Sequence, residues 1–346
     1  MVSHLDKLFF AKHLAMMIKA GLPLKEGVAT IEEQTASKKF RRILRDVVKR
    51  LENGESLGES LARYPKIFSQ LFIDMIKMGE QSGNLERNLD YLADQIEKSF
   101  ILRRKVISAM IYPVIILTST FGLGAALSLF ILPKLIPFFK SLKVELPLPT
   151  KILLFITELI QNYGLFFLFG AILLISFLII ISRLRLVRLI SHKIILKMPV
   201  AGTVSKNLNL ALFSRTLGTL VRSGISIVEA LDITAETLNN LVYQKEIKEI
   251  CSKVQSGKKI SSYLKAKKKL FPATFSRMVM VGEKTGNLEQ SLFYLSEFYE
   301  KEVDNTTQRL STILEPVLLI IIGLIVAFIA VSIISPIYQL TRGLQK

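Results

Sequence analysis

Side chains of the kind that bind metal ions occur at regular places in this chain of 346 residues. Glu26 lies in the predicted second helix, and Glu80 and Asn84 lie in the segment MGEQSGNLE, residues 78–86. If these helices fold back on one another, two carboxylates and an amide oxygen can converge, and such donors suit calcium or magnesium. The same glutamates can instead form ion pairs with nearby lysines. Both interpretations stay open, and the metal hypothesis names Glu26, Glu80 and Asn84 as ligands.

The segment around Glu80 occurs twice in the chain. Residues 281–289 read VGEKTGNLE, so that Gly79, Gly83 and Asn84 have counterparts 203 residues later (282 − 79 = 203). These counterparts are Gly282, Gly286 and Asn287. The same offset, without gaps, pairs further identical residues: Phe10 with Phe213, Gly21 with Gly224, Glu26 with Glu229, Pro113 with Pro316 and Pro133 with Pro336. A register held over more than a hundred residues predicts a duplicated domain.

A helix–helix corner accounts for most of the repeated segment without any ligand. Gly83 can adopt the positive φ of a helix stop, and Asn84 can cap the next helix. Glu86 then lies in the first turn of that helix, where a carboxylate meets the positive end of the helix dipole. Gly79 allows the two helices to approach closely. This stereochemistry does not require Glu80, which therefore stays the candidate ligand.

The rest of the sequence lacks the patterns of a catalytic centre. It contains no G-x-x-x-x-G-K-[ST] phosphate loop and no nucleophile elbow. Its three histidines, His4, His13 and His192, are too dispersed to suggest an acid–base or metal site. The single cysteine, Cys251, excludes an intrachain disulfide and a cysteine-built metal site. The sequence therefore predicts that the protein is not an enzyme and requires no cofactor.

Charged residues are absent from three long stretches. These uncharged stretches lie between Lys105 and Lys134, between Glu158 and Arg183, and between Glu315 and Arg342. Each is longer than the roughly 20 residues that a helix needs to cross a bilayer. We therefore predict three transmembrane helices, at residues 106–132, 163–182 and 316–335.

Basic residues beside the spans predict the orientation. Residues 103–105 are Arg-Arg-Lys, and a second basic cluster follows the second span. We therefore place residues 1–105 and 183–308 in the cytoplasm, and the linker 133–162 and the tail 336–346 outside. The net charge of +18 is explained by this enrichment of lysine and arginine on the cytoplasmic side of the membrane. The basic clusters lack interleaved aromatic residues, so direct binding of nucleic acid is not expected.

Both repeats are predicted to be helical. Residues 40–51, FRRILRDVVKRL, place their apolar side chains on one stripe with the 3.6-residue period of an amphipathic helix. Gly21 and Gly54 suit helix ends, and Ser56 suits the cap of a short helix. The predicted fold class is all-α, with two homologous cytoplasmic helical bundles of about six helices each and three transmembrane helices.

With these features the sequence resembles the type II secretion system F proteins, a family that includes the inner-membrane platform proteins of type IV pili and of competence systems. The resemblance rests on the duplicated helical domain, on Gly-Glu-x-x-Gly-x-Leu-Glu in both copies, and on residues 105–133, which lead into and through the first span. In that segment Pro113 and Pro133 match the family, and Pro316 and Pro336 repeat them. We expect Pro113, Pro133 and Pro316 near helix ends. Many relatives carry a longer leader before the first repeat.

The resemblance implies a membrane platform without chemistry of its own. Such proteins couple a cytoplasmic assembly ATPase to filaments of pilin or pseudopilin, for type IV pilus biogenesis, protein secretion or DNA uptake, together with other inner-membrane assembly proteins. The implied location is the cytoplasmic (inner) membrane, with several spans, the N-terminus inside and the C-terminus outside. A homo-oligomer, dimer or trimer, is expected. Some relatives bind calcium in the cytoplasmic domain, and the matching positions here are Glu26, Glu80 and Asn84.

A small multi-pass transporter is the alternative. Transporters also contain internal repeats, but those repeats lie mainly in the membrane and bring polar groups to its midplane. Here the duplicated part lies mostly outside the predicted spans, and the spans hold no charge. The platform interpretation is therefore preferred.

Overall fold

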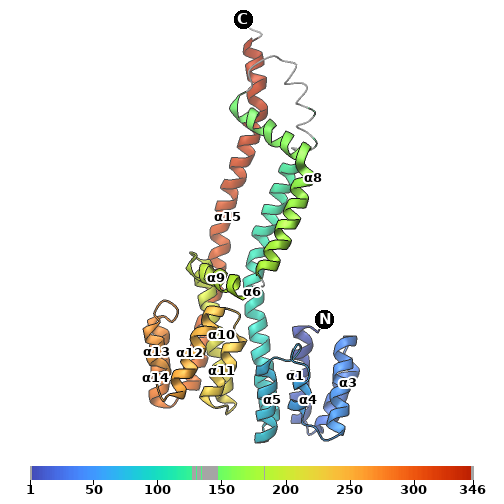
Figure 1. Ribbon diagram of the computed structural model, residues 1–346, viewed down its shortest axis with the longest axis vertical. Coiled ribbons are helices and arrows are strands. Elements are labelled where there is room, and N and C mark those ends of the chain that lie inside the picture. The colour runs from blue at the N-terminus through green and yellow to red at the C-terminus, as the bar shows by residue number, and fades with distance from the viewer. Residues whose placement is uncertain (1, 127–129, 131–133, 135–146, 183, 344–346) are drawn as a thin grey trace. The chain divides into compact units, whose positions relative to one another are not determined.

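The structure, a computed structural model, describes residues 2–126, 130, 134, 147–182 and 184–343 (Figure 1). These residues form helices and contain no strand, which confirms the all-α fold class. The chain divides into two compact units. The first unit contains Met1–Val106, here called the first repeat, and Leu189–Thr306, here called the second repeat. The second unit contains Ile107–Arg188 and Thr307–Lys346.

The first repeat is built from six helices that start at serine caps or turns. They are α1 (His4–Lys19), α2 (Leu24–Gln34), α3 (Lys38–Glu52), α4 (Leu57–Ala62), α5 (Gln70–Ser82) and the start of α6 (Leu85–Ala126). Before α1, α3, α4 and α5 a serine side chain accepts a hydrogen bond from a backbone N–H of the first turn, and one of these caps is the expected Ser56. Gly21 and Gly54 follow α1 and α3 with positive φ, the conformation expected of a helix stop.

The second repeat has the same helices in the same register. They are α10 (Ala201–Arg222), α11 (Ile227–Thr237), α12 (Leu241–Gln255), α13 (Ile260–Ala266), α14 (Ala273–Thr285) and the start of α15 (Leu288–Gly343), preceded by α9 (Arg185–Lys197). The first and last residues of α11, α12 and α14 lie 203 positions after those of α2, α3 and α5 (227 − 24 = 203). The duplicated bundle of about six helices is therefore confirmed.

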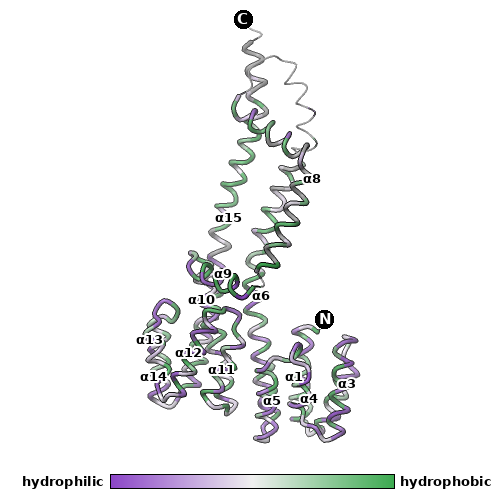
Figure 2. The backbone as a smooth tube through the Cα atoms, viewed as in Figure 1, coloured by the Kyte–Doolittle hydropathy of each residue, from purple (hydrophilic) through white to green (hydrophobic). Residues whose placement is uncertain are grey.

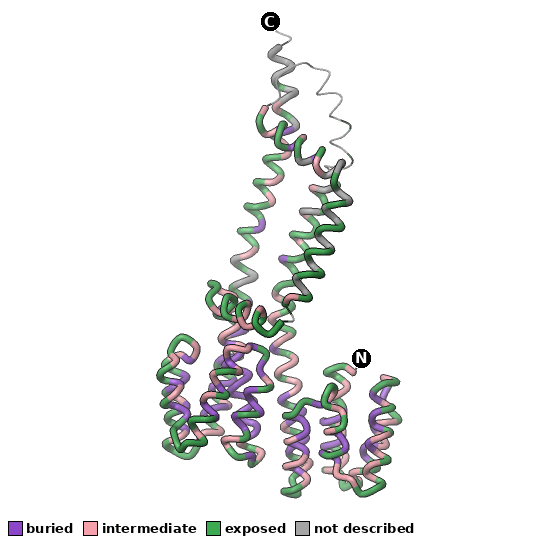
Figure 3. The backbone as a smooth tube through the Cα atoms, in the orientation of Figure 1, coloured by how far each residue is buried: buried purple, intermediate pink, exposed green. Residues whose placement is uncertain are grey.

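Each repeat encloses an aromatic core at equivalent positions. In the first, Phe10, Phe40, Phe68 and Phe72 are at most 2% exposed, with ring centroids 4.9–6.2 Å apart where they touch. In the second, the same four places hold Phe213, Tyr243, Phe271 and Phe275. The hydroxyl of Tyr243 donates to the carbonyl of Leu270 at 2.9 Å, which satisfies the one polar atom that this substitution adds. In Figure 3 buried residues alternate with exposed ones along the helices of both repeats.

The second unit consists of long apolar helices. Among the described residues, two helices are long and apolar enough to cross a membrane, over Leu85–Gly124 and Leu288–Ser332, and their most apolar windows are mostly exposed. Figure 2 shows hydrophobic residues following one another along α15. The predicted span 163–182 lies in α8 (Leu148–Ser182). The number of spans and the orientation stay predictions.

The structure changes two details of the expected membrane part. α8 begins at Leu148, inside the stretch predicted as a linker. The start of α8 packs against α15, where the buried hydroxyl of Thr150 donates to the carbonyl of Ser332 at 2.7 Å. Pro113 lies inside α6 and Pro316 inside α15, so the prediction that they lie near helix ends is wrong. A predicted span boundary is not a helix boundary, and a long helix tolerates a proline where neighbouring groups compensate the lost hydrogen bond. Pro133 lies outside the described residues.

Candidate functional site at the helix corner and the interface between the repeats

The repeated segment forms a left-handed stop between α5 and α6. Gly83 has a φ of 68°, and its counterpart Gly286 has a φ of 73°. The N–H of Asn84 donates to the carbonyl of Gly79 at 2.9 Å, and the N–H of Gly83 donates to that of Glu80 at 3.4 Å. This pair of hydrogen bonds is the Schellman arrangement, which satisfies the last carbonyls of a helix. The carbonyl of Asn84 then accepts the first bond of α6, from Asn88.

The glycine at the start of the segment permits close contact between the two helices. A Cβ on Gly79 would lie 2.9 Å from the Cα of Leu85. A Cβ on Gly282 would lie 3.0 Å from the Cα of Leu288 and 2.7 Å from the Oγ of Ser291. Backbone atoms at such distances cannot move aside without shifting a helix. In both repeats, therefore, any larger residue would push the two helices apart.

Glu80 completes the corner by binding a third helix. Its two carboxylate oxygens accept hydrogen bonds from the N–H groups of Leu57, at 2.6 Å, and Gly58, at 2.9 Å. Glu283 does the same for Ile260, at 2.6 Å, and Ser261, at 3.0 Å. These are the first amides of α4 and α13, which have no partner within their own helices and carry the positive end of the helix dipole. The glutamate left unexplained by the sequence therefore has a structural role in each repeat.

The three proposed metal ligands occupy different surroundings. Glu80 is bound to α4, Glu26 is exposed on α2, and Asn84 is exposed with its amide nitrogen donating to the carbonyl of Ser82 at 3.0 Å. Within the part of the chain that the structure describes, no group of three or more His, Cys, Asp or Glu side chains is arranged to hold a metal ion. The calcium site stays a prediction.

Arg215 on α10 is the centre of the contact between the repeats. Its side chain is only 6% exposed and binds two acids. The Nε atom lies 2.6 Å from Glu300 of its own repeat, and Nη1 lies 3.3 Å from Asp94 on α6. A buried guanidinium is stable only when it is paired in this way. Sequence reasoning missed Arg215, although one signal was present: it is the only charged residue between Lys206 and Arg222.

Further polar contacts connect the same helices. The buried Gln95 donates to the Oγ1 of Thr216 at 2.8 Å. The guanidinium of Arg222 lies 4.5 Å from the ring centroid of Tyr91, a cation–π contact. Lys105 of α6 pairs with Asp304 of α15 at 2.5 Å. The interface is thus formed mainly by α5 and α6 of the first repeat and by α10 and α11 of the second, and the start of α1 lines a cavity within it.

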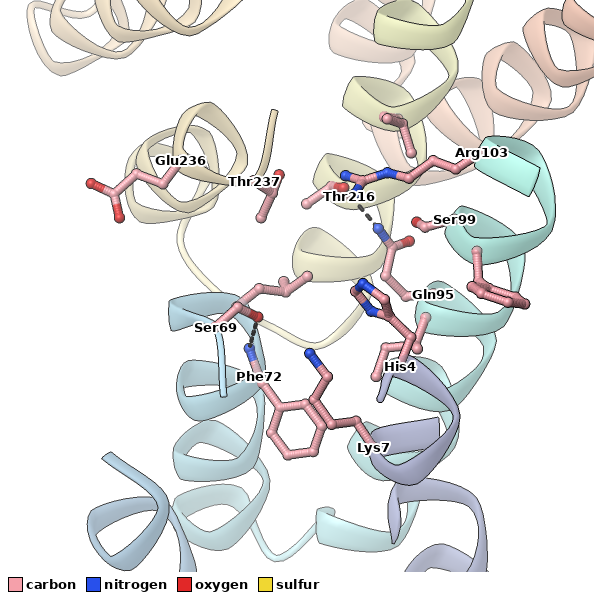
Figure 4. Close-up of a pocket in the computed structure, with 14 residues that line it drawn as sticks. His4, Lys7, Ser69, Phe72, Gln95, Ser99, Arg103, Thr216, Glu236 and Thr237 are labelled. Atoms are coloured by element: carbon pink, nitrogen blue, oxygen red, sulfur yellow. Dashed lines mark hydrogen bonds between the residues drawn. The ribbon is translucent and has the colours of Figure 1, made fainter. Parts of the chain in front are cut away.

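A cavity of about 270 Å³ lies in this interface (Figure 4). Lys7 points into it, His4 and Arg103 line the same side, and Glu236 on the opposite side points away and pairs with Lys248 at 3.5 Å. Burial lowers the pKa of Lys7 and the pKa of His4, and neighbouring cations add to both effects. The charge that lines this cavity is mainly positive, so it favours an anionic group over a cation.

Comparison with known proteins now assigns the family. Residues 10–133 and 213–336 each match the family described as type II secretion system (T2SS), protein F. The chain belongs to this family. The two matched stretches begin 203 residues apart (213 − 10 = 203), the offset of the repeated corner. The F-family match therefore covers most of both repeats and continues along the apolar parts of α6 and α15 in the second unit.

Relatives of this F-family protein carry two kinds of name. The chain is 36% identical to the type IV pilus assembly protein PilC of Thermus thermophilus, over 97% of this chain and 82% of that protein. It is 34% identical to the PilC of Myxococcus xanthus, over 98% and 81% of the two chains. It is 32% identical to the type II secretion system protein F of Aeromonas hydrophila, over 96% and 85%.

Proposed function

We propose that this F-family protein is a non-enzymatic platform in the cytoplasmic (inner) membrane, which couples an assembly ATPase to the assembly of pilin or pseudopilin filaments. The relatives include pilus assembly and secretion proteins, so the proposal covers both kinds of machine, and DNA uptake as a third. Those names favour it over the transporter alternative. The observation that carries the proposal is the continuity of two helices.

α6 runs from the corner at Leu85 to Ala126, and α15 runs from the corner at Leu288 to Gly343. Each helix contributes to the core and interface of a repeat at its start and becomes a long apolar segment further on. A helix rises about 1.5 Å per residue and resists bending, so it transmits a displacement that a flexible linker would absorb. The contact of Arg215 with Asp94 and Glu300 supports the view that both repeats respond to the ATPase as one body.

The test interrupts this continuity without disturbing the interface. A Gly-Gly-Ser-Gly-Gly spacer inserted after Ile107 or after Thr307 lies beyond the Lys105–Asp304 pair. We expect normal expression and membrane insertion but no filaments or secretion. The control inserts Ala-Glu-Ala-Ala-Ala-Lys-Ala at the same places. These seven residues add about two helical turns and so continue the helix, and this variant should retain more assembly. Normal filaments with the flexible spacer would contradict the coupling mechanism.

A second test concerns the source of energy. The purified chain should hydrolyse no ATP, and the assembly ATPase should co-purify with the full chain from membranes. Because the proposal needs an external motor, absence of the ATPase from the purified complex would contradict it. ATP turnover by the chain alone would contradict the non-enzymatic role.

The orientation is tested by cysteine labelling after Cys251→Ser. Lys143→Cys, in the predicted external linker, should react with an impermeant maleimide on intact cells. Lys258→Cys, exposed beyond α12 in the second repeat, should not. Labelling of Lys258→Cys from outside would reverse the proposed topology.

Calcium binding by the first repeat is tested through Glu26, because Glu80 already binds α4. Calcium at millimolar concentration should raise the melting temperature of the full chain. Glu26→Gln should remove this rise, whereas Glu229→Gln, the same change in the second repeat, should leave it. If calcium does not change the melting temperature of the unaltered chain, the hypothesis is wrong.

A further inference from the structure

The two repeats contact each other through different faces of the same fold. The first repeat uses the face of α5 and α6, here called the α5/α6 face, and the second uses the face of α10 and α11, here called the α10/α11 face. Each repeat also has the other face. The contact is therefore heterologous, which means that it joins two different faces. The second repeat keeps an uncovered α14/α15 face, equivalent to the α5/α6 face. The first repeat keeps an uncovered α1/α2 face, equivalent to the α10/α11 face.

The α14/α15 face exposes apolar side chains where its counterpart is covered. Phe298 is 43% exposed, whereas Gln95 at the same place in the first repeat is 4% exposed. Tyr294 is 57% exposed and Val281 is 48% exposed. These residues line a groove of about 360 Å³ together with Met278 and other side chains. Clustered aromatic residues of this kind are typical of protein interaction surfaces.

The α1/α2 face shows the matching exposure. Phe9 is 38% exposed, whereas Leu212 at the same place in the second repeat is 7% exposed. Met16 is 59% exposed, whereas its counterpart Thr219 is 4% exposed. At Phe298, Phe9 and Met16 the uncovered faces therefore expose apolar side chains at positions that are buried in the other repeat.

The charged and aromatic pairs of the internal contact also have counterparts on the uncovered faces. Asp94 pairs with Arg215 inside the chain, and the same offset puts Glu297 on the α14/α15 face and Lys12 on the α1/α2 face. Glu297 is exposed, and Lys12 is held to Glu97 at 3.5 Å with its side chain 56% exposed. A neighbouring Glu297 could therefore join Lys12 as Asp94 joins Arg215.

The aromatic–cation contact is kept in the same way. Arg222 lies over Tyr91 inside the chain, and the equivalent residues on the uncovered faces are Lys19 and Tyr294. Lysine can replace arginine over an aromatic ring, with some loss of contact area.

One position makes the contact between copies more favourable than the internal one. Asp74 on α5 faces two acids of α11. Burial raises the pKa of Asp74, and the charges of Glu229 and Glu236 both raise it further, while Lys77 on its own helix lowers it. At the place of Asp74 the second repeat has the exposed Arg277. The places of Glu229 and Glu236 correspond to the exposed Glu26 and Glu33 of α2. Between copies, the repulsion between these acids is thus replaced by the attraction of an arginine for two glutamates.

We propose that the α14/α15 face of one copy of this chain docks on the α1/α2 face of a second copy, repeating between chains the contact that joins the two repeats within a chain. Because the two faces differ, each chain can bind one neighbour on each side. Such an interface produces a ring when the rotation between neighbours closes, rather than a two-fold dimer. The docked arrangement also gives the exposed Glu26 a partner, Arg277 of the next copy.

The first experiment distinguishes head-to-tail from two-fold contact. In a Cys251→Ser background, Phe298→Cys and His13→Cys are placed in separate full-length chains with different tags. Phe298 is equivalent to Gln95 and His13 to Thr216, and these two residues are hydrogen bonded in the internal contact. The two cysteines should therefore lie close together when one copy docks on the next. After mixing in detergent and reconstitution into bilayers, a short bis-maleimide should link the two tags. Either variant alone should give no linked product. Lys39→Cys on α3 replaces His13→Cys as the matched control and should give none.

The second experiment uses charge reversal, with oligomer mass in detergent as the readout. Arg277→Glu should weaken self-association by about tenfold or more. Adding Glu33→Lys in the same chain should restore much of it. Phe298→Asp should also weaken it, and the accompanying fall in melting temperature should be small because the ring is 43% exposed. Linked product from Phe298→Cys alone, or a mass unchanged by both Arg277→Glu and Phe298→Asp, would overturn the proposal. A full-length chain that is monomeric under all conditions would also overturn it.

Discussion

The first and second repeats share a corner but differ in the charged residue at one central place. Arg215 in the second repeat is 6% exposed and binds two acids, whereas Lys12 at the equivalent place is 56% exposed and binds one. The corner glutamates Glu80 and Glu283 make the same two backbone hydrogen bonds in both copies. The comparison shows that the requirements of the fold are kept in both copies, while the faces have diverged according to what covers them.

The difference at Arg215 and Lys12 has a physical cause. A covered cation loses its hydration and must be compensated by fixed acids, whereas an exposed lysine keeps water around it. A planar guanidinium can bind two carboxylates at once, which an ammonium on a flexible stem does less well.

The largest effect is expected from Arg215→Met. Removing the cation leaves Glu300 with a largely buried charge, so the free energy of unfolding should fall by about 3 kcal/mol, the low end for a broken buried pair. Lys12→Met, the same change at the exposed position, should cost at most about 1 kcal/mol. Denaturant unfolding of the full chain in detergent, followed by circular dichroism, measures both. Equal losses would show that the two positions do not differ in burial as described.

The corner glycines should give the next largest effect. Gly83→Val and Gly286→Val place a β-branched residue at positive φ, which costs roughly 1–3 kcal/mol. Gly83→Asn is the control and should be milder, because asparagine tolerates this conformation. Melting temperatures of the full chain should fall by similar amounts for the two valine variants. A loss in one repeat only would mean that the corner is not an equivalent element in both.

A smaller effect is expected from the corner glutamates. Glu80→Gln and Glu283→Gln keep one acceptor oxygen but remove the charge facing the first amides of α4 and α13, at a cost of about 1–2 kcal/mol. The loss should be less than that of Gly83→Val and nearly equal in the two repeats. Asp90→Asn, an exposed change on α6, serves as the control in the same melts. If neither glutamine variant differs from this control, the hydrogen bonds to α4 and α13 do not contribute to stability.

The smallest effect concerns pH and the acids in the interface. Burial raises the pKa of Asp74 above 3.8, and Glu229 and Glu236 add to the shift. Because the folded protein holds this proton more tightly, the stabilisation from protonation is complete below pH 3.8 and is lost as the pH rises through the folded-state pKa. Asp74→Asn should therefore raise the melting temperature near neutral pH and make no difference in acid. A constant difference across the pH range would rule out titration of Asp74 as its cause.

Local patterns in the sequence were enough for the helices and the corner. The offset between Gly79 and Gly282 established the duplication, and the positive φ of Gly83 follows from its place after an apolar helix. Ser56 caps α4 because its partner lies three residues away. Such interactions involve residues close in sequence, so propensity and spacing determine them before any tertiary packing.

Only the tertiary structure decided what binds Glu80 and Arg215. Glu80 binds amides 22 and 23 residues earlier, and Arg215 binds an acid 121 residues away in the other repeat. Residue type reveals that a buried charge needs a partner, but the choice of partner depends on which faces pack together. The sequence contains both faces twice, and nothing local in it tells which pair meets. Packing of α5 and α6 against α10 and α11 made that choice, and so determined which surfaces stay uncovered.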